Sequence, residues 1–151
     1  MNNTISKENF IEMLQFAFDN NQKFSFMPSG TSMKPMLNGT TDTACLCKKP
    51  LVLKKYDVVM YIRRRDNALA LHRIVKVEAN NFFTMSGDNQ YYVDENIHYD
   101  DIIAVLCEYT HKGKTFSVDS LHFRVFTYYI LFKKKIKKLL LKLRTKKPDS
   151  R

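Results

Sequence analysis

Short stretches of alternating apolar and polar residues follow residue 22, and they constrain the fold more than any other feature of the chain. In the longest, residues 68–77, every second side chain falls on the same face of a strand, so His72 and Arg73 must point in opposite directions. Because turn signals separate these stretches, the sequence predicts a small, mostly β (α+β) antiparallel domain. The other expected strands are around Phe24 and Phe26 and at residues 43–47, 57–62, 82–85 and 102–109.

Helical periodicity marks both ends of the chain. Residues 5–19 form an amphipathic pattern with Ser6 as a candidate cap, and it is too short and polar for a membrane span, which needs about 20 mostly apolar residues. After a predicted hairpin turn at residues 112–114, helical spacing returns from Leu121. We therefore expect an N-terminal helix packed on the domain (1–22), a β domain (23–118) and an amphipathic basic C-terminal segment (119–151).

The net charge of +10 is concentrated in the C-terminal segment. Residues 133–151 contain ten lysines or arginines and one acid, so the rest of the chain is almost neutral. An apolar stripe opposite the lysines is typical of a helix that lies on an anionic membrane surface. A helix docked on the domain ranks close behind this interpretation, and a nucleic-acid arm ranks third.

The three cysteines are interpreted as small strand residues. Cys45, Cys47 and Cys107 cannot all pair within one chain, and no secretory signal precedes them. A reducing, cytoplasmic location, with attachment at the inner face of the membrane as a further option, is therefore expected. The histidines lack metal-ligand spacing, so no metal site is predicted.

A serine, a histidine and an acid occur in the order that a hydrolase needs. Ser32 lies in the segment GTSMKP (residues 30–35), His72 follows forty residues later, and Asp88 lies in the Gly-Asp-Asn sequence at residues 87–89. Each fragment alone is ordinary turn, cap or core chemistry. A serine hydroxyl is a poor nucleophile that needs a neighbouring base, and the base needs an orienting partner. The three fragments together therefore indicate nucleophilic catalysis.

The combined pattern resembles the catalytic core of the type I signal peptidases and their LexA-like relatives. In those proteins Ser-Met-x-Pro carries the nucleophile, a following strand carries the base, and Gly-Asp-Asn closes the site. The likeness covers roughly residues 24–108. The base is a lysine in the ordinary bacterial and LexA-like branches and a histidine in the endoplasmic-reticulum, archaeal and some Gram-positive branches. His72, directly before Arg73, resembles the histidine branch.

The resemblance implies that Ser32 is the nucleophile and His72 the general base. Two acids are candidates for the third role: Asp94 is favoured as the orienting carboxylate, with Asp88 bracing the loop, but spacing alone leaves both open. The backbone N–H of Ser32 is the implied oxyanion donor. Substrate-contacting residues then include Gly30, Thr31 and Met33, and supporting residues are Pro35, Arg73, Gly87 and Asn89.

One position departs from the family pattern. Many relatives have a serine two positions before the nucleophile, and its hydroxyl supplements the oxyanion hole. Gly30 occupies that position here, and whether Thr31 replaces the missing hydroxyl stays open.

The implied activity is that of a serine endopeptidase, with no metal or nucleotide cofactor, which removes a leader or signal-like segment from a precursor peptide through an acyl-enzyme. The alternative is an inactive relative that serves as a peptide-binding or membrane-associated regulatory module, because a fold does not guarantee chemistry. A LexA-like repressor ranks lower, since 22 residues leave no room for a helix-turn-helix unit and the base is not a lysine.

Overall fold

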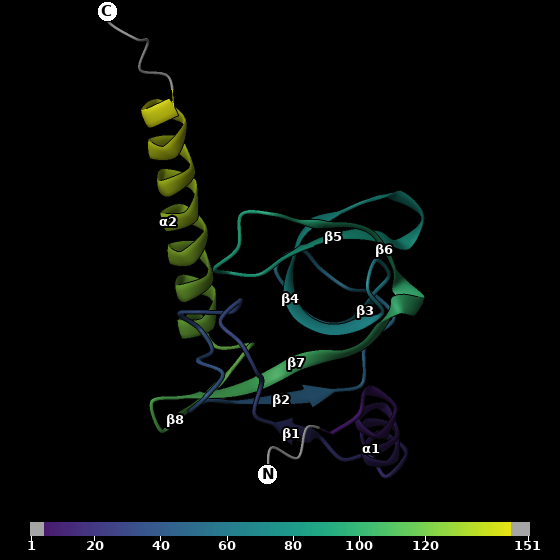
Figure 1. The fold of residues 1–151 in the computed structure, drawn as a ribbon. Helices are drawn as coiled ribbons and strands as arrows, with labels where there is room; N and C mark the ends of the chain where they lie inside the picture. Colours follow the sequence, from purple (N-terminus) through teal and green to yellow (C-terminus); the bar gives the residue numbers. More distant parts are fainter. Residues whose placement is uncertain (1–4, 146–151) are drawn as a thin grey trace, which may run out of the picture.

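An antiparallel sheet curls into a half-barrel in the computed structural model, which describes residues 5–145 (Figure 1). The strand order is β1-β2-β7-β3-β4-β5-β6, and β8 pairs with β7. The predicted mostly β, antiparallel architecture with a helix at each end is confirmed. The strands are β1 (Phe24–Phe26), β2 (Thr43–Cys47), β3 (Val58–Arg63), β4 (Ala68–Val77), β5 (Phe82–Ser86), β6 (Asp94–His98), β7 (Ile102–His111) and β8 (Lys114–Ser117), with single 3-10 turns η1 (Ala79–Asn81) and η2 (Tyr99–Asp101).

The first helix, α1 (Lys7–Asp19), packs on the sheet as the periodicity predicts. The Ser6 hydroxyl accepts a hydrogen bond from the Asn9 N–H at 3.2 Å, which satisfies one of the free donors at the helix start. The helix then buries Leu14 and Phe18 in the hydrophobic core.

Two hydrophobic clusters follow the alternation along β4. Leu71 packs in one cluster with Met60 of β3, and Ile74 packs in the other with Tyr61. His72 therefore shares its face with Tyr61, whereas Arg73 lies on the opposite face, as the period of two requires.

The second helix, α2 (Leu121–Thr145), is docked along only part of its length. Phe123, Thr127 and Ile130 are buried, and beyond them the helix extends past the sheet (Figure 1). The predicted apolar stripe of this distal part is exposed at Phe132, Ile136, Leu139, Leu140 and Leu143. Residues 1–4 and 146–151, which belong to the predicted terminal segments, lie outside the described residues. Within the described range, none of the helices combines the length and the apolar character that crossing a membrane requires.

Two strands are absent from the sequence prediction. In β6 only Ile97 supplies a buried apolar side chain among polar neighbours, so no alternation marks this strand. In β8 no side chain is fully buried. Its pairing with β7 follows from the predicted hairpin turn, where Lys112 and Gly113 take positive φ angles. Both strands are therefore defined by backbone pairing rather than by an apolar face.

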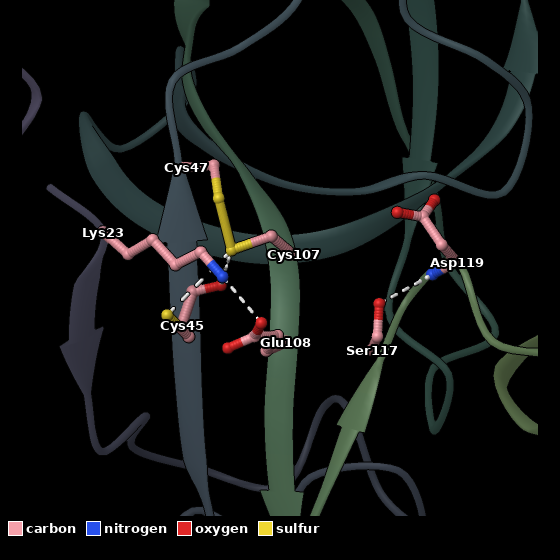
Figure 2. Close-up of a disulfide and its surroundings, with 7 residues drawn as sticks. All are labelled: Lys23, Cys45, Cys47, Cys107, Glu108, Ser117 and Asp119. Carbon is pink, nitrogen blue, oxygen red and sulfur yellow. Dashed lines mark hydrogen bonds and ion pairs between the residues drawn. A yellow bond between two sulfur atoms is a disulfide. The ribbon is translucent and has the colours of Figure 1, made fainter. Parts of the chain in front are cut away.

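All three cysteines lie on strands, as expected, but Cys47 and Cys107 form a disulfide, which the expected reducing setting does not predict (Figure 2). Their Cα atoms lie 5.9 Å apart on the neighbouring strands β2 and β7. Cys45 remains free, with its Sγ 4.0 Å from that of Cys107. The pairing joins residues 60 positions apart and removes the cysteine-based reason for expecting a reducing compartment.

Candidate active site

Ser32 and His72 line one pocket of about 170 Å³ between the loop after β1 and the first half of β4. The sheet pairing explains why His72 reaches this pocket. Pairing with β5 begins only at Arg73, so residues 68–72 have β3 on one side and no strand from residues 5–145 on the other. Within the described chain, the pocket is lined by Pro28, Ser29, Gly30, Ser32, Met33, Leu37, Gly39, Arg63, Leu69, Ala70, Leu71, His72 and Gln90.

The loop that carries Ser32 leaves its reactive groups unbonded. Gly30 has φ +87°, a left-handed conformation that side chains disfavour, and it turns the chain just ahead of Ser32. Met33 is buried and anchors the loop in the core. Neither the hydroxyl nor the backbone N–H of Ser32 donates a hydrogen bond to any described residue. Both are therefore free for a substrate, as a nucleophile and an oxyanion donor must be.

A tyrosine connects His72 to Asp94. The Tyr61 hydroxyl lies 3.0 Å from His72 Nδ1 and donates to Asp94 Oδ2 at 2.6 Å. The direct distance from His72 Nδ1 to Asp94 Oδ2 is 3.7 Å, too long for a hydrogen bond. Asp94 reaches this position at the start of β6, and its other oxygen lies 3.4 Å from Arg65 Nη1.

This connection fixes the histidine tautomer. A phenol has one proton, and here it goes to Asp94, so the Tyr61 oxygen can only accept from His72. His72 must then carry its proton on Nδ1, which leaves a lone pair on Nε2. Burial and the hydrogen bond to Asp94 raise the pKa of Tyr61 far above its ordinary value, so the hydroxyl keeps its proton. Nε2 has no hydrogen-bond partner among residues 5–145.

Burial keeps the imidazole neutral. His72 is 3 % exposed, and desolvation lowers the pKa of His72 to about 4, although the negative charge of Asp94 opposes the shift. The neutral form is therefore the dominant one at pH 7. A base with the ordinary histidine pKa near 6.5 would be partly protonated there.

The Gly-Asp-Asn loop holds the loop that carries Ser32 in place. The Asn89 N–H donates to the Ser32 carbonyl at 2.8 Å, and the Asn89 side-chain amide donates to the Thr31 carbonyl at 3.3 Å. A Cβ at Gly87 would lie 2.7 Å from the Ser32 carbonyl oxygen, closer than such atoms approach. Only glycine permits this contact, so Gly87 and Asn89 position the segment around Ser32.

Asp88 has a different partner from Asp94. Both of its carboxylate oxygens accept from Arg73, each at 2.8 Å, and Arg73 is fully buried. Arg73 also donates to the Tyr56 carbonyl and to Thr127 of α2, both at 3.1 Å. Asp94 is thus connected to His72 through Tyr61, whereas Asp88 is paired with the buried Arg73 and braces the loop.

Not all of the predicted site residues line this pocket. Thr31 and Pro35 do not line the pocket that contains Ser32 and His72, whereas Ser29, one position before Gly30, does. Lys76, a lysine on the same strand as His72, is exposed and paired with Glu78. Tyr61 and Gln90 were not predicted, because neither belongs to a recognisable motif and both reach the site through tertiary structure.

No family model matches the chain, and no curated protein has a significant sequence match to it. Within the described range, no group of three or more histidine, cysteine, aspartate or glutamate side chains is arranged to hold a metal ion. The functional assignment therefore depends on the geometry of the site.

Proposed function

We propose that the protein is a serine endopeptidase of the histidine-type signal-peptidase class, acting on a leader or signal-like segment of a precursor peptide. One observation carries the proposal: an unbonded serine hydroxyl shares a pocket with a buried, neutral histidine whose tautomer is set by Tyr61 and Asp94. In the described range, His72 Nε2 is not one of the fully buried atoms that lack a partner, so it is accessible to solvent or a substrate. In His72, the nitrogen that is left unbonded is the one that a general base uses.

The backbone around the pocket supports a peptide as the substrate. Residues 68–72 of β4 have an unpaired edge, and Pro28 and Ser29 continue from β1 on the other wall. An extended peptide between them would gain backbone hydrogen bonds of the kind used in strand addition. Beyond the pocket, a wider groove of about 620 Å³ is lined mainly by apolar residues such as Phe26, Met27 and Met60. This groove suits the apolar part of a leader segment.

The proposed reaction is acyl transfer. Ser32 Oγ attacks the scissile carbonyl while His72 Nε2 takes its proton, and the Ser32 N–H stabilises the oxyanion. The positive charge on the imidazolium is stabilised by Asp94 through Tyr61. His72 then gives the proton to the leaving amine, and a water molecule, deprotonated by the same nitrogen, hydrolyses the ester and restores Ser32.

Covalent labelling distinguishes the proposed peptidase from the alternative, an inactive peptide-binding module with the same fold. A fluorophosphonate probe should modify the wild-type protein, and mass spectrometry of its peptides should locate the adduct on Ser32. An unlabelled, folded protein that still binds peptides in its groove would favour the alternative.

The role of Tyr61 gives a specific prediction. Tyr61→Phe removes the acceptor for the Nδ1 proton, so the lone pair is no longer held on Nε2, and kcat should fall roughly 100-fold. Asp94→Asn should lower kcat in the same direction, because the charge that stabilises the imidazolium is lost. Steady-state kinetics and thermal melting of both variants provide the measurement.

Asp88→Asn is the matched control for this prediction. Removing one partner of a buried ion pair costs about 3–5 kcal/mol, so this variant should melt at a clearly lower temperature. Its residual folded fraction should keep the wild-type pH profile. A kinetic defect confined to Asp88→Asn, with Tyr61→Phe and Asp94→Asn fully active, would contradict the assignment of the acid.

We also propose that the distal part of α2 binds an anionic membrane surface. Its exposed stripe includes Leu139, Leu140 and Leu143, and α2 contains no acidic residue beside its lysines. Apolar area and basic charge act together at such a surface, where each basic residue adds about 1 kcal/mol.

Vesicle sedimentation tests this attachment. Leu139→Gln, Leu140→Gln and Leu143→Gln, combined in one variant, should weaken binding to anionic vesicles without changing the melting temperature, since these side chains are exposed. The control is Leu51→Gln with Val52→Gln, two exposed apolar residues outside the helix. Salt at about 0.5 M should weaken wild-type binding. Equal sedimentation of wild type and triple variant would refute the attachment.

A further inference from the structure

A second pocket, of about 160 Å³, lies beside the catalytic pocket and is lined by four lysines. Three come from α2, namely Lys133, Lys134 and Lys137, and Lys34 comes from the loop of the nucleophile. The one acid in its lining is Asp88, and both oxygens of that carboxylate already accept from Arg73. The protein therefore leaves the positive charge of this pocket without a counter-charge.

The contacts of these lysines are with neutral groups. Lys134 is half-buried and donates to two neutral acceptors, Ser86 Oγ at 2.8 Å and the Gly87 carbonyl at 2.9 Å. Lys133 and Lys137 lie over the rings of Tyr129 and Tyr91. In the described range, none of the four lysines forms an ion pair. Such a concentration of like charge in a hollow attracts anions.

Gln90 joins this lysine pocket to the catalytic pocket, because its side chain lines both. Its Oε1 atom is buried near Gly87 and has no hydrogen-bond partner within the described chain. On the other side of the catalytic pocket, Pro28, Ser29, Leu69 and Leu71 also line the apolar groove. The pocket of Ser32 and His72 therefore has lining residues in common with each of the other two hollows, which lie on either side of it.

We propose that the lysine pocket is a specificity subsite for a carboxylate of the peptide substrate. This inference rests on the proposed peptidase function and adds a substrate class: a peptide with apolar residues on one side of the scissile bond and an acidic residue on the other. The carboxylate pairs with the lysines, while the apolar segment occupies the groove beside β1. Both ends of the substrate then contribute to placing its carbonyl at Ser32.

The binding arm of the test does not depend on catalysis. Acetyl-Glu-Glu-Glu-amide is titrated into the ¹⁵N-labelled full-length protein, with acetyl-Gln-Gln-Gln-amide as the uncharged control. The acidic peptide should shift the amide signals of Asn89, Gln90 and Lys134, and the neutral peptide should not. Lys133→Gln with Lys137→Gln should weaken the binding about tenfold. Lys135→Gln with Lys138→Gln, on the same helix but outside the pocket lining, should leave it within about twofold.

The outcomes separate the two proposals. Saturable binding of the acidic peptide without cleavage of any peptide would uphold the pocket and refute the peptidase function. Cleavage of peptides with the same efficiency by both lysine double variants would refute the subsite and leave the peptidase intact. Signal shifts caused by anionic vesicles but not by the acidic peptide would also refute it, since the pocket would then bind lipid head groups. Melting curves of both variants check that they are folded.

Discussion

Ser32→Ala is expected to lower the rate of peptide cleavage by about 10⁴-fold or more, to the level left by substrate binding alone. The change removes the atom that forms the acyl-enzyme in the proposed reaction. Ser32 Oγ makes no hydrogen bond to a described residue, so its loss removes no native contact. The melting temperature should therefore stay within about 2 °C of the wild type.

Ser29→Ala is the matched control for this variant, because Ser29 lines the same pocket on the same loop. Ser29→Ala should retain the acyl-enzyme route. Its cleavage rate should fall by no more than the contribution of a single oxyanion donor, at most about 10³-fold. Turnover of a fluorogenic peptide and thermal melting are measured for both. Wild-type turnover by folded Ser32→Ala would end the serine-peptidase account.

His72→Ala is expected to be as inactive as Ser32→Ala over the whole pH range. The wild-type protein should remain active to an unusually low pH. Because burial lowers the pKa of His72 to about 4, the imidazole stays neutral well below the ordinary histidine pKa of about 6.5. The acid limb of kcat/KM should therefore fall near pH 4 and not near pH 6.5. Kinetics from pH 3.5 to 8 provide the measurement.

The same shift predicts how stability depends on pH. Between pH 6.5 and 4 the unfolded chain binds a proton at residue 72 that the folded chain does not bind, so the free energy of unfolding should fall as the pH falls through this window. His72→Ala should lack this contribution. Activity retained by His72→Ala would require a lysine base, whereas an acid limb near 6.5 would mean that the histidine is solvated.

Local periodicity was sufficient to predict much of the fold. The alternation along β4 places His72 and Arg73 on opposite faces, and the burial of Ile74 and Leu71 in separate clusters follows it. α1 and its Ser6 cap follow from helical spacing in the same way. In each case the signal lies within a few consecutive residues, so no tertiary contact is needed to detect it.

Apart from the short strands β6 and β8, the unpredicted features depend on contacts between distant segments. In the sequence, Tyr61 is an ordinary residue on the apolar face of β3. Only the strand register shows that it lies beside His72 and Asp94. The Cys47–Cys107 pairing likewise requires β2 and β7 to be neighbours. The choice between Asp88 and Asp94 was open in the sequence because spacing does not say which face each acid meets. The buried Arg73–Asp88 pair supplies that information.

The most direct test of the peptidase account is to incubate the purified protein with a proteome-derived peptide library and to identify new peptide termini by mass spectrometry. Wild type should generate a consistent class of cleavage sites, with apolar residues on one side of the cut and an acidic residue on the other. Ser32→Ala and His72→Ala should generate none of them. A library left intact by the folded wild-type protein, or cut identically by all three proteins, would contradict the account.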